Sequence, residues 1–230
     1  MFLIDKARKQ FAVASEPVPI DNDGGASTAS LTPLSDIAEA FEELALLVEP
    51  PESGDLQLSS FCEACSHVSV LFGCLGLAFK FAELEYVSKV RNLNEASSRF
   101  TTLHDILDLD VANDTVKVQG SYSRNLRRVR QGLDLIRALF EQFLTSDDYC
   151  LKEAASTAYA EVCAPYHTWA VRTAVSAGMY ALPTREQLLI KLNETEKSAE
   201  KKMRRYIEAS IPVINYIDKL YISRNITLDW

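Results

Sequence analysis

Apolar side chains recur at spacings of three and four residues along most of this chain, and alternation of apolar and polar residues is scarce. Spacings of three and four place apolar residues on one face of a helix, whereas a strand needs a spacing of two. The clearest apolar stripe consists of Leu126, Val129, Leu133, Ile136, Phe140 and Phe143. The pattern therefore predicts an all-α fold.

The same spacing, read together with the prolines that interrupt it, predicts eight helical segments. They are expected at residues 35–48, 57–77, 80–94, 100–112, 119–145, 150–181, 186–192 and 195–223. Pro165 should break or kink the sixth segment, and Pro212 should bend the last one.

The chain before the first helix lacks this periodicity. Residues 10–33 include Pro17, Pro19, two adjacent glycines and a run of small polar residues, a composition typical of chain that does not pack into a core. We expect a mobile N-terminal arm at residues 1–33 and a single domain at residues 34–230, for which 47% hydrophobic residues supply a sufficient core.

Apolar runs and cysteine content indicate the cellular compartment in which the protein is expected. The longest apolar run, from Val68 to Phe79, is too short to span a bilayer, and the charges that follow Ile4 leave no apolar region for a secretory signal. The five cysteines are an odd number without a repeating framework, which favours free thiols in a reducing compartment. We expect a cytoplasmic protein.

A metal site is the alternative use of the cysteines. Cys62, Cys65 and His67 lie close together in the sequence, but no second pair stands at ligand spacing. Cysteines three residues apart on a helix are usually core residues. We therefore expect neither a metal ion nor a cofactor.

Charge is distributed unevenly. The chain has a net charge of -8, yet residues 117–137 contain six basic residues and one acid. A helical wheel places Arg127, Arg130 and Arg137 on one flank, where Arg130 can pair with Asp134 and Arg137 with Glu141 one turn away. These three arginines are expected to be solvated.

Arg124 and Arg128 point away from that flank, along a face that continues through Leu135 and Leu139 and is largely apolar. Two guanidinium groups one turn apart repel by about 3 kcal/mol at an effective dielectric constant near 20. A doubly charged phosphate would offset that repulsion, and the planar fork of arginine suits its oxygens. Pairing with a distant Asp or Glu is the open alternative.

Two further groups have both a structural and a functional interpretation. Glu85 and Lys89 stand one turn apart, as an ordinary exposed ion pair would. His167 lies between Tyr166 and Trp169, where a hydrogen-bonded core histidine is as natural as a ligand contact. A Gly-rich phosphate loop, a nucleophile elbow and a metal-ligand series are missing from the sequence, so we do not expect an enzyme.

Six segments together resemble the glycolipid transfer protein superfamily, in particular its ceramide-1-phosphate branch and the plant members of that branch that are linked to cell death. They are LFGCLG at 71–76, FKFAE at 79–83, YVSKV at 86–90, RNLRR at 124–128, YHTW at 166–169 and ALPTR at 181–185. The resemblance extends over residues 35–230.

The resemblance implies a two-layer all-α sandwich of about eight helices that encloses a lipid pocket. It implies a cytosolic carrier of ceramide-1-phosphate or phytoceramide-1-phosphate that contacts membranes transiently and catalyses no reaction. The phosphate would be held by Lys89, Arg124 and Arg128, and the ceramide amide by Glu85 and His167.

Two positions set the ligand that the resemblance implies. Arg128 stands where sugar-binding relatives place a stacking tryptophan, which disfavours a sugar headgroup. Glu85 replaces the aspartate usual in the family and is longer by one methylene. This departure keeps a second hypothesis open: a lipid sensor or helical protein-interaction module that binds phosphate headgroups without transferring them, whose protein partners the sequence leaves unknown. Nucleic acid is not an expected partner, because the chain around the basic residues is acidic.

Overall fold

A computed structural model of the chain describes residues 32–49, 55–76, 79–145 and 151–230. The predicted N-terminal arm lies outside the described residues, apart from Thr32 and Pro33. Both belong to the start of the first described helix: the Thr32 hydroxyl accepts from the backbone N–H of Ser35, and Pro33 occupies the first helical position, where its missing N–H costs nothing.

The described ranges contain α-helices and two short 3₁₀ helices, and within them only an isolated bridge between Gln57 and Thr102 is strand-like. None of these helices is long and apolar enough to cross a bilayer. The all-α prediction is confirmed. The elements are α2 (Pro33–Val48), α3 (Leu58–Cys74), α4 (Lys80–Ala96), α5 (Leu103–Ala112), α6 (Tyr122–Thr145), α7 (Leu151–Val162), η2 (Ala164–Tyr166), α8 (Trp169–Gly178), η3 (Met179–Ala181), α9 (Arg185–Leu192) and α10 (Glu196–Ile222).

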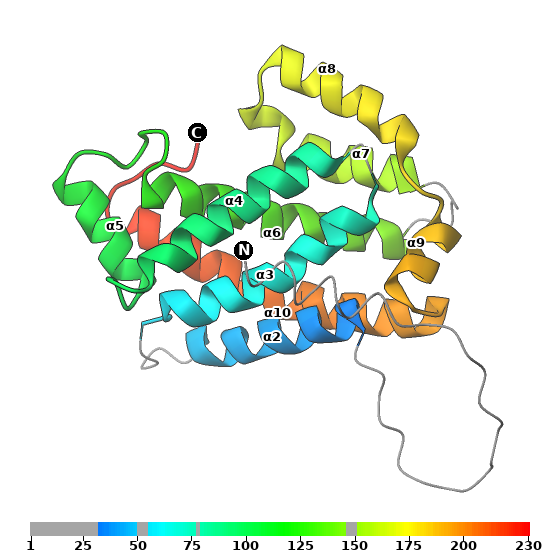
Figure 1. Cartoon of the computed structure of the whole chain (residues 1–230), viewed down its shortest axis with the longest axis horizontal. Helices are drawn as coiled ribbons and strands as arrows, with labels where there is room; N and C mark the ends of the chain where they lie inside the picture. Colours follow the sequence, from blue (N-terminus) through cyan, green and yellow to red (C-terminus); the bar gives the residue numbers. More distant parts are fainter. Residues whose placement is uncertain (1–31, 50–54, 77–78, 146–150) are drawn as a thin grey trace, which may run out of the picture. The chain divides into compact units, whose positions relative to one another are not determined.

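The break expected at Pro165 is present. The proline lies within η2, between α7 and α8, because the residue before a proline disfavours helical backbone angles. The Thr168 hydroxyl then accepts from the N–H of Val171 and starts α8. The single segment predicted at 150–181 therefore consists of four elements, α7, η2, α8 and η3. The axis of α8 does not continue that of α7 (Figure 1).

Threonines mark the starts of α5, α9 and α10. Thr102, Thr184 and Thr195 each form a reciprocal capping box with the residue three positions later, so that two backbone N–H groups are satisfied at each start. The first residue of these helices is thereby fixed by local chemistry, independently of the packing.

The helices of residues 32–230 form two layers. In one layer α2 packs on α3 and α3 on α4; in the other α10 packs on α6 and α6 on α7. The layers meet where α2 contacts α10 and α4 contacts α6, which can be followed in Figure 1. All six residues of the apolar stripe predicted on α6 are buried, so the helix at the centre of the second layer is oriented by that stripe.

Helices α4 and α6 approach each other closely at one glycine. A Cβ atom added to Gly132 would lie 2.6 Å from two ring carbons of Tyr86. The Tyr86 ring has little freedom to move away, since its hydroxyl donates to the backbone oxygen of Cys65 at 3.1 Å and its ring packs on Phe72. Only glycine fits at position 132 with this helix spacing.

Four of the five cysteines lie in the described residues, and all four are free thiols, as expected. Cys62, Cys65 and Cys163 are buried, and Cys74 is half-buried. Burial raises the pKa of the Cys62 thiol to about 12, so this group is an apolar core atom at neutral pH. Cys150 lies outside the described residues.

Replacement of Gly132 by alanine should lower the free energy of unfolding by about 1–3 kcal/mol, because the added methyl group must push the Tyr86 ring or separate α4 from α6. Gly73→Ala in α3 is the matched control: its Cβ would meet only the Glu83 carboxylate, at 3.8 Å, so the free energy should be unchanged or slightly raised. Urea denaturation followed by circular dichroism measures both. Equal effects of the two substitutions would contradict the close approach.

Candidate functional site

The start of α6, which carries the basic residues, is fixed by two buried contacts. The Asp110 carboxylate at the end of α5 accepts from the backbone N–H of Ser123 at 2.6 Å. The Tyr221 hydroxyl of α10 donates to the backbone oxygen of Ser123, also at 2.6 Å. An acid at a helix N-terminus is favoured by the helix dipole. These contacts position the first turns of α6 and with them Arg124 and Arg128.

Glu85 and Lys89 occupy successive turns of α4. Lys89 Nζ lies 3.1 Å from Glu85 Oε1, and the two side chains are 23% and 69% exposed. The predicted pair is therefore present. Its ammonium group is half-buried beside α6, while its carboxylate extends into solvent, so the lysine is the better-positioned partner for a ligand.

Arg124 and Arg128 are half-buried and use neutral partners. Arg124 Nη1 donates to the backbone oxygen of Lys117 at 2.7 Å, and Arg128 Nη1 donates to Gln131 Oε1 at 2.6 Å. Burial lowers the pKa of Arg128, and the neighbouring guanidinium groups of Arg124 and Arg127 lower it further. Neither Arg124 nor Arg128 forms a salt bridge with an acid of the described chain. The distant Asp or Glu that would have neutralised them is not found there.

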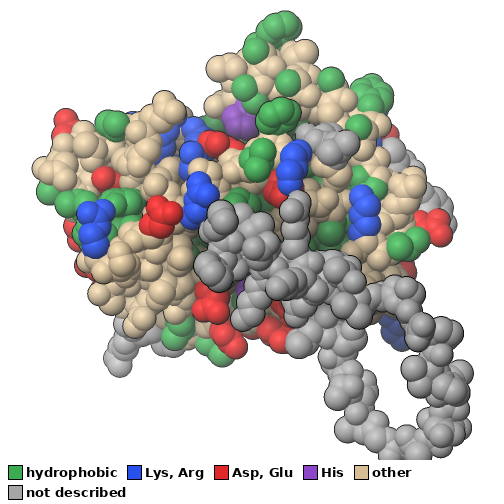
Figure 2. Space-filling model, in the orientation of Figure 1, with side chains coloured by type: hydrophobic (Ala, Val, Ile, Leu, Met, Phe, Trp, Pro, Cys, Tyr) green, Lys and Arg blue, Asp and Glu red, His purple; other side chains and the backbone are tan. Residues whose placement is uncertain are grey.

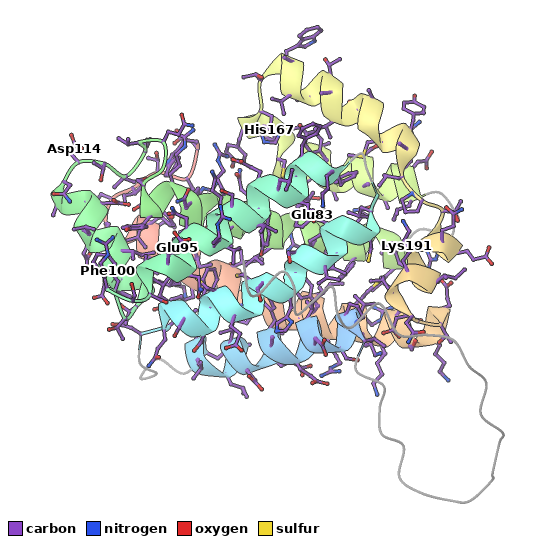
Figure 3. The ribbon with its side chains drawn as sticks, viewed as in Figure 1. Glu83, Glu95, Phe100, Asp114, His167 and Lys191 are labelled. Carbon is purple, nitrogen blue, oxygen red and sulfur yellow. The ribbon has the colours of Figure 1, made fainter. Side chains whose placement is uncertain are left out.

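His167 lies where the chain passes from α7 to α8 (Figure 3). Its Nδ1 is 2.8 Å from the hydroxyl oxygen of Tyr159, one of the residues of α7. Burial, followed by the positive charge of Arg128, lowers the pKa of His167. The imidazole is therefore neutral at pH 7.

The predicted site residues meet around Arg128. Its guanidinium group interacts electrostatically with Glu85 of α4, with Arg124 of its own helix and with His167. Figure 2 shows a histidine next to several Lys and Arg side chains on this face, over α4 and α6 and below α8. The structure thus brings residues from three separate segments into one basic surface.

The expectation of a solvated Arg127 is wrong. Its side chain is only 3% exposed; Nη2 donates to the backbone oxygen of Leu228 at 2.7 Å, and the guanidinium carbon lies 5.4 Å from the centre of the Tyr166 ring. Nε and Nη1 have no hydrogen-bond partner among the described residues. Segments distant in the sequence cover this arginine, which a helical wheel cannot show.

The two ion pairs predicted on the flank of α6 are present, but they are less exposed than expected. Arg130 pairs with Asp134 and Arg137 with Glu141, each at 2.6 Å. Arg130 also pairs with Asp218 of α10 at 2.6 Å. Arg130 therefore joins α6 to α10 in the second layer, whereas the ion pairs of Arg137 lie within α6.

An apolar cavity lies next to the basic surface. Leu135 and Leu139, which continue the face of Arg128, line it together with Tyr159 and residues of α3, α7 and η3. Its volume is about 10 Å³, room for about one water. The apolar face predicted behind the arginines is confirmed, and its cavity is closed in this conformation.

Helix α8 presents apolar groups to solvent. None of its residues is buried; Trp169 at its start is 75% exposed, and Tyr180 of η3 is 78% exposed. On α4, Phe81 and Leu84 are also exposed. Large exposed apolar side chains on neighbouring elements are typical of a surface that contacts a partner or a membrane.

An all-α, two-layer fold that places half-buried cations beside an apolar cavity defines a class of protein that binds amphiphiles with an anionic head. The sequence profile of the Glycolipid transfer protein (GLTP) family matches residues 56–194. The chain belongs to this family.

Relatives agree with that assignment. The chain is 71% identical to the ACD11 homolog protein of Arabidopsis thaliana over 204 residues, 86% of this chain and 89% of the relative. It is 49% identical to Accelerated cell death 11 of the same plant, over 86% of this chain and 96% of the relative. A crystal structure of an Arabidopsis ACD11 mutant complexed with C12 ceramide-1-phosphate matches 87% of this chain and 100% of that chain with 48% identity and a TM-score of 0.85.

Replacement of Arg127 by methionine should leave the free energy of unfolding unchanged or raise it by about 1 kcal/mol, because it removes a buried charge without an acid partner. Arg130→Met, the same substitution three residues along, should lower it by about 2 kcal/mol, since Asp218 loses its charged partner and Asp134 keeps only Arg137. Urea titration monitors both. A loss for Arg127→Met as large as that for Arg130→Met would show that the buried guanidinium group is stabilising.

Proposed function

We propose that this protein is a carrier that binds one ceramide-1-phosphate or phytoceramide-1-phosphate molecule and transfers it between membranes. The observation that carries the proposal is the position of Lys89, Arg124 and Arg128 on two facing helices, beside an apolar cavity. The relative that is bound to ceramide-1-phosphate in its crystal structure has the same fold and nearly half of its residues in common with this chain.

The three cations suit a phosphate monoester. Arg124 and Arg128 donate hydrogen bonds to neutral groups, and among the described residues Lys89 pairs with the exposed Glu85. A phosphate with about two negative charges would offset the repulsion between the guanidinium groups, and arginine binds its oxygens in bidentate fashion. A neutral sugar headgroup would leave these charges without a counter-ion.

The ceramide amide would lie between Glu85 and His167. Glu85 would accept from the amide N–H, and a neutral His167 would donate to the amide carbonyl. The interaction of Arg128 with both residues supports a phosphate site and an amide site within one cluster. An acceptor and a donor next to the phosphate-binding cations suit a lipid in which the amide group is separated from the phosphate by a few carbon atoms.

The lipid chains need a larger space than the closed cavity. A ceramide with about 25–30 chain methylenes would cost about 20 kcal/mol to expose to water, so a carrier must enclose them. Because α8 has no buried residues and Met179 of η3 lines the cavity, outward movement of α8 together with η3 would open the cavity, and Met179 is the core side chain that it would displace.

Transient contact with a membrane is part of the proposal. The exposed Trp169 and Tyr180 flank α8, and a tryptophan or tyrosine is favoured at the boundary between lipid and water. A net charge of -8 opposes tight binding to anionic membranes, so a carrier could leave after loading. We infer a cytoplasmic protein that visits membrane surfaces and makes or breaks no covalent bond in its ligand, with residues 34–230 as the carrier domain.

Arg128→Leu should lower the affinity for ceramide-1-phosphate about 10- to 100-fold, since a charge-assisted contact with phosphate is lost. Arg204→Leu on α10, which removes an exposed arginine paired with Glu200, is the matched control and should change nothing. Transfer of a fluorescent ceramide-1-phosphate between vesicles measures both. Transfer by Arg128→Leu at the rate of the unmodified protein would refute the phosphate role.

A lipid sensor that binds without transferring is the second candidate, and Glu85 is the observation that favours it. The Glu85 side chain is longer than the aspartate usual in the family, and its carboxylate already contacts Lys89. The carboxylate is therefore shifted from the position in which an aspartate would contact the ceramide amide. A carrier should transfer lipid with Glu85 in place, and Glu85→Asp should keep or increase the rate. If the unmodified protein binds lipid without transfer and Glu85→Asp remains inactive, the sensor is the better description.

A further inference from the structure

Tyr159 is a residue of the site to which the sequence assigned no role. Its hydroxyl lies 2.8 Å from Nδ1 of His167, and the two rings are 5.6 Å apart between centroids. Its ring also lines the apolar cavity. Tyr159 therefore contacts both the histidine of the proposed amide site and the space proposed for the lipid chains.

We propose that Tyr159 is a positioning residue that fixes the tautomer of His167. In this tautomer Nε2 carries the proton, and the Nε2–H group donates a hydrogen bond to the amide carbonyl of the lipid. This inference rests on the proposed function, and it adds a residue that determines specificity for an N-acylated sphingoid base.

The direction of the hydrogen bond follows from the chemistry of the two groups. In a neutral imidazole one nitrogen donates and the other accepts. The ring nitrogen is a stronger base than a phenol oxygen, and the phenol O–H is a stronger acid than an imidazole N–H. The stable arrangement therefore has Tyr159 donating to Nδ1, which leaves the proton of His167 on Nε2.

The surroundings keep both groups neutral at pH 7. Burial lowers the pKa of His167, and Arg128 lowers it further. Burial raises the pKa of Tyr159, as does Cys163, while Arg172 acts in the opposite direction. Burial also raises the pKa of Cys163, to about 12, so the thiol near the pair is uncharged. A protonated histidine would turn Nδ1 into a donor and disrupt the contact with the Tyr159 hydrogen.

A purely structural role for Tyr159 makes a different prediction. If the ring served only to line the cavity, Tyr159→Phe would leave lipid binding unchanged, because this substitution keeps the ring and removes only the hydroxyl oxygen. If the hydroxyl orients His167, the same change must weaken recognition of the amide and nothing else.

The experiment compares two lipids that differ at the amide. Tyr159→Phe should lower the affinity for a short-chain ceramide-1-phosphate about 3- to 10-fold, the effect of one hydrogen bond. Its affinity for sphingosine-1-phosphate, which has the phosphate but no acyl amide, should be unchanged. Tyr216→Phe removes another tyrosine hydroxyl, one that accepts from the Leu56 N–H at 3.1 Å, and should affect neither lipid. Isothermal titration calorimetry measures all the affinities.

A double-substitution cycle tests whether Tyr159 acts through the histidine. In a His167→Ala background, Tyr159→Phe should cause no further loss of affinity for ceramide-1-phosphate. Nitrogen chemical shifts of the His167 ring should report the Nε2–H tautomer in the unmodified protein and a mixture of tautomers in Tyr159→Phe. Equal losses for both lipids, additive losses in the cycle, or a proton on Nδ1 would each overturn the inference.

Failure of the proposed function gives a separate result. If the unmodified protein binds neither lipid, the carrier proposal is wrong and the amide role of His167 falls with it. If the unmodified protein binds ceramide-1-phosphate and Tyr159→Phe binds it equally well, only the role of Tyr159 is refuted.

Discussion

The close contact between Gly132 of α6 and the ring of Tyr86 of α4 sets the distance between the two layers at the site. Tyr86 follows Glu85 and precedes Lys89 by three residues, while Gly132 is one turn beyond Arg128. The contact therefore lies about one helical turn from Lys89 on α4 and from Arg128 on α6. Because Tyr86 is held by Cys65 and Phe72, the spacing between Lys89 and the arginines derives from core packing and does not depend on a bound ligand.

That fixed spacing has an electrostatic cost. Arg124, Arg127 and Arg128 lie within two turns of one helix, and like charges held close in a partly buried site repel. Further along α6 the charges are compensated, since Arg130 and Arg137 pair with carboxylates of α6 and α10. The helix is thus divided into an end whose charges are compensated internally and an end whose charges are not. In the proposed function, selectivity for an anionic ligand would follow from that division.

Periodicity predicted what depends on one helix at a time. The buried stripe of α6, the ion pairs one turn apart and the interruption at Pro165 are local consequences of sequence. The burial of Arg127 was missed because it depends on Leu228 and Tyr166, which approach α6 only after the chain has folded. Tyr159 was missed for a related reason: its contact with His167 spans a broken helix, where no helical spacing relates the two residues. Helical spacing singled out Arg124 and Arg128, whereas only the family resemblance joined Lys89 to them in the proposed phosphate site, since spacing alone does not connect α4 to α6.

Glu85 shows how the phosphate site and the amide site depend on each other. In the free protein its carboxylate contacts Lys89. In the proposed complex the phosphate would bind Lys89. The negative phosphate would then repel the Glu85 carboxylate if the carboxylate stayed next to Lys89. The longer side chain allows Glu85 to swing away from the phosphate while its backbone stays fixed next to Tyr86. Binding of the phosphate would thereby release the acceptor that the amide N–H requires, so that the head of the lipid would be recognised before its amide.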